Sequence, residues 1–216
     1  VCFIADVGTL PKWLKVSQAL DYVEGVHPRF SRSKAEAFLA TTEIPAHKKI
    51  KALSKGMVTQ LHLALVMAIE VKLLVLDEPT LGLDILYRKE FYDRLLNDYF
   101  DGERTVIIST HQVEEIETLL SHLIFINQGK IALDLPMAEI PDRYTEVLVR
   151  AKDVDEAMGL QPISVRDLMG KKACIFENVP RERLQQFGEL HTPGVSDLFV
   201  AKLRSRHNQE EVDAHG

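Results

Sequence analysis

Two adjacent carboxylates, Asp77 and Glu78, follow an apolar run of four residues from Leu73 to Leu76. Such a run predicts a strand that is buried on both faces, as in a parallel sheet. Ligands of open α/β sheets bind at the carboxyl ends of the strands, and successive strand side chains point to opposite faces. We therefore expect different roles for the two acids. Asp77 suits a Mg²⁺ ligand, and Glu78 suits the orientation or deprotonation of a water that attacks a terminal phosphate.

A helix cap is the alternative interpretation of the acids, because Pro79 would suit the first position of a helix. Two neighbouring motifs argue against it. The sequence Leu-Ser-Lys-Gly-Met at residues 53–57 precedes the strand by a short helix, and His111 follows a second apolar strand at residues 105–110. A neutral imidazole at that edge can hydrogen-bond the γ-phosphate or the attacking water. The other seven histidines, His62 among them, show no ligand spacing and are expected at the surface or with a polar partner.

Ser54 and Gly56 stand at the start of an apolar run, Met57 to Ala68, that favours a buried helix. A helix start has free backbone N–H groups and a positive dipole end, which together bind phosphate. Ser54 can offer its hydroxyl, and Gly56 lets the backbone come close to a ligand. A plain N-cap is the alternative for this pair. Lys55 either adds a positive charge near a phosphate or is a solvated lysine that opposes the helix dipole.

The order of these motifs resembles the ATP-binding subunit of ABC transporters over residues 1–135. The resemblance places Ser54 and Gly56 in the signature motif, Asp77 at the Walker B aspartate, Glu78 at the catalytic glutamate, Asp84 at the D-loop aspartate and His111 at the switch histidine. Asp6 aligns with the Q-loop glutamine, and a carboxylate there can still bind Mg²⁺ or a water. The Leu-Ser-Lys-Gly-Met signature is a form associated with ABC-2 exporters. ATP and Mg²⁺ are the cofactors that the resemblance implies.

The expected fold is α/β, a partial P-loop NTPase-like ABC ATPase core with a helical subdomain at about residues 12–70. Residues 136–206 are expected to form a small α+β appendage, and residues 207–216 a disordered tail. The expected helices cover residues 16–26, 33–41 (capped by Ser33, with Pro45 ending the segment), 85–99, 112–120 and 193–203 (capped by Ser196). The expected strands of the later part are a hairpin over residues 123–133 with Gly129 in its turn, and residues 145–150 and 172–177. Glu114, Glu115 and Glu117 are expected on a solvated helix face.

No Gly-x-x-x-x-Gly-Lys-Ser/Thr phosphate loop occurs in the 216 residues. The chain begins with Val1 in a strand-like segment, so we expect it to start late through truncation or a partial reading frame. Without that loop, these residues alone are expected to bind ATP weakly and to hydrolyse it negligibly.

Composition is typical of a globular protein, with 46% hydrophobic and 27% charged residues. The net charge of −6 gives no support to a nucleic-acid surface. The two cysteines, Cys2 and Cys174, have no metal spacing and fit a reducing cytosol. No apolar stretch reaches the roughly 18 residues of a membrane-spanning helix, so any membrane link is expected to come through a partner chain.

The resemblance thus implies an ATP-hydrolysing subunit that works as a homodimer beside a membrane permease, on the cytoplasmic face of the membrane. Trp13 and Leu14 either line a groove for that permease or pack in the core. One alternative is a DNA-associated ATPase of the SMC and repair type, although no heptads precede Leu53. Another is a non-catalytic regulatory protein with the same fold. The transported substrate does not follow from these residues.

Overall fold

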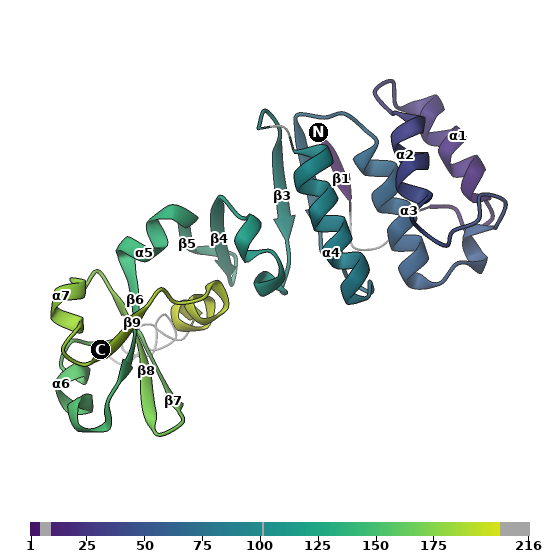
Figure 1. The fold of residues 1–216 in the computed structure, drawn as a ribbon. Coiled ribbons are helices and arrows are strands. Elements are labelled where there is room, and N and C mark those ends of the chain that lie inside the picture. The colour runs from purple at the N-terminus through teal and green to yellow at the C-terminus, as the bar shows by residue number, and fades with distance from the viewer. Residues whose placement is uncertain (5–9, 101, 204–216) are drawn as a thin grey trace. The chain divides into compact units, whose positions relative to one another are not determined.

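Three parallel strands form the sheet of the N-terminal part of the chain (Figure 1). They are β1 (Cys2–Ile4), β2 (Leu73–Asp77) and β3 (Thr105–Ser109), in the order β1-β2-β3. The computed structural model describes residues 1–4, 10–100 and 102–203. The chain divides into two units, residues 1–111 and 112–216. Asp6 and the predicted disordered tail lie outside the described residues.

The central strand β2 is fully buried on one face only, so the prediction of burial on both faces is wrong. Leu74 and Leu76 are 0% exposed, whereas Leu73 and Val75 are half-buried. On the more open face, Val75 lies between Phe3 of β1 and Ile107 of β3 in the sheet register. The strand itself is confirmed, and its carboxyl end carries Asp77.

The N-terminal unit also contains helices. They are α1 (Val16–Val26), α2 (Arg32–Leu39), the 3₁₀ turn η1 (Ile50–Ala52), α3 (Lys55–Met67) and α4 (Ile85–Arg94), which continues as the π-helical turn η2 (Leu95–Tyr99). The bounds predicted for α1 are confirmed. The helix α2 begins earlier than predicted, because Ser31 and not Ser33 is its N-cap and accepts a hydrogen bond from the backbone of Lys34. It ends at Leu39, six residues before Pro45.

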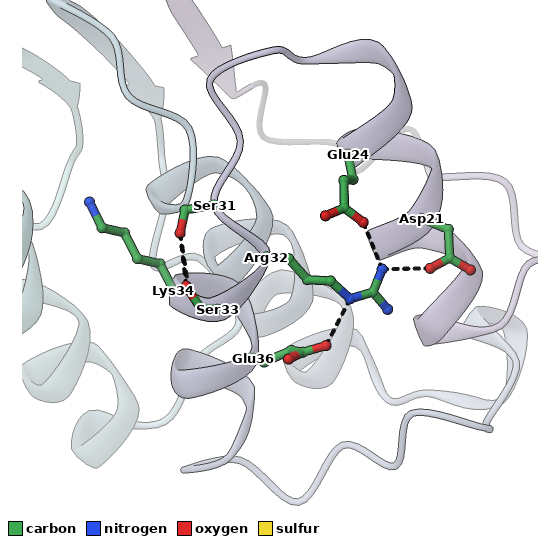
Figure 2. A network of polar contacts seen from close by, with 7 residues as sticks. All are labelled: Asp21, Glu24, Ser31, Arg32, Ser33, Lys34 and Glu36. Carbon is green, nitrogen blue, oxygen red and sulfur yellow. Dashed lines mark hydrogen bonds and ion pairs between the residues drawn. The ribbon is translucent and has the colours of Figure 1, made fainter.

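The first helices pack through an apolar cluster that also includes Leu14. Members of this cluster are Val16, Ala19 and Leu20 of α1, Ala35 of α2, Ile50 of η1 and Leu61, Ala64 and Leu65 of α3. Arg32 reinforces the packing from outside, as Figure 2 shows. Its guanidinium donates to Asp21 and Glu24 of α1 at 2.6 and 2.9 Å, and to Glu36 on its own helix at 2.9 Å. The two helices are therefore joined by one shared cation.

His62, on α3, departs from the expectation of a surface or partnered side chain. Its Nε2 atom is buried and has no hydrogen-bond partner within the described ranges. Burial lowers the pKa of His62, because an apolar environment disfavours the charged ring. The unfolded chain, in contrast, takes up a proton at this residue near the ordinary pKa of about 6.5.

We therefore expect the free energy of unfolding to fall as the pH drops from 7 to 5, in part through His62. Below about pH 6.5 the His62 ring binds a proton in the unfolded state but not in the folded state, and this difference lowers the free energy of unfolding. His62→Leu should make this loss smaller, by up to about 1 kcal/mol at pH 5. Denaturant unfolding at several pH values measures the difference. An identical pH dependence in both proteins would contradict the assignment.

The C-terminal unit opens with two 3₁₀ turns, η3 (Val113–Glu115) and η4 (Glu117–Leu119), so the prediction of one helix over residues 112–120 is wrong. Glu117 is also not simply solvated. Its Oε1 accepts a hydrogen bond of 3.2 Å from the backbone N of Val195, at the start of the helix over residues 195–203. This bond gives that helix an acidic cap from a distant segment. Ser196, the predicted cap, lies inside the helix.

The predicted hairpin is confirmed as β4 (His122–Asn127) and β5 (Lys130–Pro136), with Gln128 and Gly129 at positive φ in the turn. Its inward residues Leu123, Phe125, Leu133 and Leu135 pack with residues of the appendage, including Tyr144 and Leu198. By packing the hairpin belongs with the C-terminal unit. The functional boundary at residue 135 stays a prediction.

The appendage is a four-stranded antiparallel sheet of order β7-β8-β6-β9, in which a βαββαβ chain order gives a split βαβ arrangement. Its strands are β6 (Tyr144–Val149), β7 (Ser164–Leu168), β8 (Lys171–Glu177) and β9 (Gly188–His191). Short helical pieces connect them: η5 (Met137–Glu139), α5 (Ile140–Arg143), η6 (Ala151–Asp153), α6 (Val154–Met158) and α7 (Arg181–Leu184). The α+β expectation is correct for this part, although β7 and β9 were not predicted.

Glu177 ties this sheet to the helix over residues 195–203. It accepts hydrogen bonds from Lys202 at 2.7 Å and from Arg143 and the Tyr144 hydroxyl at 2.9 Å. Burial raises the pKa of Glu177, but these three donors outweigh it and leave the pKa below its usual value. Along the described residues we find no helix with the length and hydrophobicity needed to cross a bilayer.

Candidate functional site at the carboxyl ends of β2 and β3

The last residues of β2 and β3 lie side by side, since Asp77 and Ser109 are partners in the parallel register. In-register side chains of neighbouring strands project from the same face of a sheet. The Ser109 hydroxyl accordingly donates a short hydrogen bond to Oδ1 of Asp77. This bond fixes one oxygen of the carboxylate, while a carboxylate has further lone pairs available for a cation. The hydroxyl partner was not predicted from the sequence.

Glu78 leaves the strand in a left-handed conformation, with φ of 44°. Its backbone N still donates to the carbonyl of Ser109 at 3.0 Å. Its side chain accepts from the backbone N of His111 at 2.9 Å and contacts His111 Nδ1 at 2.7 Å. Thr110 adds a longer hydrogen bond of 3.4 Å. The structure thus brings together the three residues that the sequence singled out for metal and water chemistry.

The contact between Glu78 and His111 defines how the ring can act. A carboxylate only accepts hydrogen bonds, so Nδ1 of His111 carries the proton. In the neutral ring Nε2 is then an acceptor. It can accept a hydrogen bond from a water but cannot donate one to a phosphate oxygen. Donation to a γ-phosphate would require the protonated ring. The ring is 63% exposed and the Glu78 side chain 24% exposed, so solvent or a ligand can reach both.

The helix-cap interpretation of the acids is wrong, because residues 78–84 form turns. Leu81 N donates to the Glu78 carbonyl and Leu83 N to the Thr80 carbonyl, each at 3.1 Å. The helix α4 starts only at Ile85, and Asp84 is its cap. Oδ1 of Asp84 accepts from Leu86 N at 3.0 Å and from Tyr87 N at 3.2 Å.

Buried polar contacts hold this turn in place. Thr80 is 1% exposed and lies 3.2 Å, hydroxyl to hydroxyl, from Tyr92 of α4. Arg88 donates from Nε to the Leu83 carbonyl at 2.9 Å. Sequence reasoning missed both contacts, since neither side chain stands at a recognisable motif spacing. The turn is therefore anchored to α4 at two points.

Ser54, Lys55 and Gly56, the predicted signature residues, lie at the start of α3, where Ser54 is the N-cap. Ser54 Oγ accepts from Met57 N at 3.2 Å, which is the plain N-cap of the alternative interpretation. Its hydroxyl proton is still able to donate to a ligand. The start of α3 also touches the turn after β2, because a Cβ on Gly56 would lie 3.3 Å from the Gly82 carbonyl oxygen. The stem of Lys55 covers Gly82, with Cδ and Cε 3.5 Å from the position of a Cβ there.

The donor set fits Mg²⁺ in the manner of a nucleotide site. Throughout the described ranges, no group of three or more His, Cys, Asp or Glu side chains could hold a metal ion. An all-protein metal cage is thus not formed by these residues. Mg²⁺ usually keeps several waters and binds one or two carboxylates together with substrate phosphates. Asp77, held at one oxygen by Ser109, can supply such a ligand.

Comparisons with known proteins bear on this arrangement. No protein-family model matches the chain. The ABC transporter ATP-binding protein YtrB of Bacillus subtilis is 27% identical over 195 residues, which are 86% of this chain and 67% of that protein. The Nod factor export ATP-binding protein I of Burkholderia orbicola is 38% identical over 129 residues, 59% of this chain and 40% of that protein. The chain therefore spans from 40% to 67% of the length of these relatives.

Solved structures show the same fold. The ATP-binding subunit of an ABC transporter has a TM-score of 0.57 at 20% identity, and the match covers 65% of this chain and 60% of the chain in that structure. A putative cobalt transport ATP-binding protein has a TM-score of 0.53 at 17% identity, and the match covers 79% of this chain and 61% of the chain in that structure. The fold is that of an ABC ATPase domain. The chain is therefore similar in sequence to ATP-binding proteins of ABC transporters, and it has their fold.

Proposed function

We propose that this chain is the ATP-binding and ATP-hydrolysing subunit of an ABC-type exporter and drives transport through a membrane permease. The observation that carries the proposal is the meeting of Asp77, Glu78 and His111 at one edge of the sheet, with Glu78 hydrogen-bonded to His111 at 2.7 Å. ATP and Mg²⁺ are the proposed cofactors. The relatives named for Nod factor export support export as the direction of transport.

Each residue has a separate part in the proposed chemistry. Bound Mg²⁺ would neutralise charge on the phosphates, and Asp77 would bind it directly or through water. Glu78 would orient the attacking water and take its proton, as a general base does. His111, with its proton at Nδ1, would hold Glu78 in place and offer Nε2 to a water. Ser54, Lys55 and Gly56 would contact phosphate at the positive end of α3.

Two copies of the chain are proposed to act together. The helix start that carries Ser54 and Gly56 would complete the ATP site of the opposite copy, and Asp84 would order the turn at their interface. Nucleotide would then favour the closed pair, and hydrolysis would release it. The pair would sit at the cytoplasmic side of the membrane, attached to the permease. Asp6, which aligns with the Q-loop glutamine, is proposed to bind Mg²⁺ or a water.

These residues alone are expected to hydrolyse ATP negligibly, since their sequence has no glycine-rich phosphate loop. The test is phosphate release by the native complex, purified with its membrane partner. We expect Mg²⁺-dependent hydrolysis that Asp77→Asn lowers at least tenfold. A complex that binds ATP but never hydrolyses it would favour the non-catalytic regulatory alternative. The relatives described above are transport proteins, which favours transport over a DNA-associated ATPase.

A further inference from the structure

Two lysine-rich segments that are remote in sequence lie side by side in the N-terminal unit, residues 12–16 and 48–51. An isolated antiparallel bridge places Lys15 opposite Lys49. Backbone hydrogen bonds join the segments, from Ile50 N to Leu14 O (2.9 Å), from Lys51 N to Lys12 O (2.9 Å) and from Val16 N to Lys48 O (3.1 Å). The pairing therefore gathers lysines that the sequence separates by more than thirty positions.

Buried aliphatic side chains and exposed lysines lie next to one another along both segments. Leu14, Val16 and Ile50 are buried in the core of the helical subdomain. The exposed residues between them are Lys12, Trp13, Lys15, Lys49 and Lys51. We call these five residues the lysine–tryptophan patch. The patch forms only when the two segments pair, so the linear sequence does not show it.

The patch carries positive charge that no carboxylate of the described residues pairs with at ion-pair distance. Lys15 and Lys49 lie directly opposite one another, and like charges in such positions destabilise the pairing. Within the described ranges, none of the four lysines forms an ion pair with a carboxylate. The acids of α1 and α2 are instead bound by Arg32, as Figure 2 shows. An external anion would relieve this repulsion, and the net charge of −6 makes a local cationic surface more distinctive.

Trp13 gives the patch its second chemical character. Its side chain is 69% exposed, so the core-packing alternative is wrong for Trp13, whereas Leu14 at 8% does pack in the core. Tryptophan is enriched at membrane–water interfaces, where the indole lies at the level of the headgroups. Lysines near anionic lipid each strengthen the attraction to that surface. Four point charges and one indole suit a charged surface better than one peptide of defined sequence.

We propose that the lysine–tryptophan patch binds anionic phospholipid headgroups. The N-terminal unit would then contact the bilayer directly, in addition to any contact with a permease. This contact needs neither ATP nor the residues at the ends of β2 and β3. It therefore goes beyond the proposed function and stands or fails separately from it.

The experiment uses Trp13 as its probe, because it is the single tryptophan of the chain. The full chain is mixed with vesicles of phosphatidylglycerol and phosphatidylcholine, or of phosphatidylcholine alone. We expect a blue shift of the emission and co-sedimentation with the anionic vesicles only. Raised salt should reverse both effects, since it screens exposed charges.

Variants locate the contact on the patch. Lys15→Gln with Lys49→Gln should weaken binding to the anionic vesicles roughly tenfold or more, while Lys15→Arg with Lys49→Arg should restore it. The matched control is Lys130→Gln with Lys171→Gln, which makes the same charge change at exposed lysines of the C-terminal unit. Because Lys15 and Lys49 repel one another, the first pair of changes should not lower the melting temperature, so lost binding would not reflect unfolding.

Three results would overturn the proposal. In the first, the anionic vesicles would leave the Trp13 emission unchanged. In the second, the control pair of substitutions would weaken binding as much as the patch pair. In the third, an acidic peptide would shift the emission while the vesicles would not. The last result would assign the patch to a protein partner.

Discussion

Glu78→Gln is expected to lower ATP hydrolysis by the native complex at least about a hundredfold, because proton transfer by a positioned base contributes factors of that size. Glutamine has the same length and can still accept a hydrogen bond from the backbone N of His111, a bond of 2.9 Å in the native chain. ATP binding should therefore persist. The variant should hold ATP in the closed pair, and size-exclusion chromatography with labelled ATP would detect this.

The matched control is Glu114→Gln, which makes the same chemical change at an exposed glutamate a few residues beyond His111. It should leave turnover unchanged. Turnover within a few-fold of the native rate in the Glu78 variant would remove Glu78 from the chemistry and leave it as a structural partner of His111.

Gly188→Ala is expected to lower the stability of the C-terminal unit by about 3 kcal/mol or more. Gly188 opens β9 and lies opposite Val149 of β6. A Cβ there would lie 2.1 Å from the backbone oxygen of Leu148 and 2.9 Å from its carbonyl carbon. Backbone of a central strand cannot move aside as a flexible side chain would, so β9 would have to separate from β6.

Amide hydrogen exchange measures this effect directly, since it resolves the opening of β9 from the rest of the chain. Gly25→Ala provides the contrast. Gly25 lies in α1, and a Cβ there meets no atom within 4 Å. Alanine should stabilise that helix by about 0.5–1 kcal/mol. A loss below about 1 kcal/mol for Gly188→Ala would show that β9 adapts at little cost.

The positions of Asp77, Glu78 and His111 could be predicted from the sequence, because strand ends and ligand chemistry are local. An apolar run followed by Asp77 and Glu78 predicts where the acids lie along the sheet, and the next strand places His111 beside them. The hydroxyl of Ser109 is different, because placing it beside Asp77 requires the register of β2 and β3. Strand register is the information that the sequence alone did not supply.

Other features depend on long-range packing that no local pattern reports. Glu117 caps a helix 78 residues away, and the segment around it forms two 3₁₀ turns instead of the predicted helix. The strands β7 and β9 are short and only partly buried, so their alternation is weak. The pairing of Lys15 with Lys49 joins two segments that are remote in sequence. Such contacts are set by the tertiary fold and not by local propensity.

The central claim is that Mg²⁺ and nucleotide bind where β2 and β3 end. The most direct measurement is an NMR titration of the ¹⁵N-labelled 216-residue chain with ATP and Mn²⁺, a paramagnetic substitute for Mg²⁺. Weak binding suffices, because the metal broadens nearby amides even at low occupancy. The account predicts that the amides of Asp77, Glu78 and residues 109–111 broaden first, and that Asp77→Asn removes the effect. Selective broadening elsewhere, or none at these residues, would contradict it.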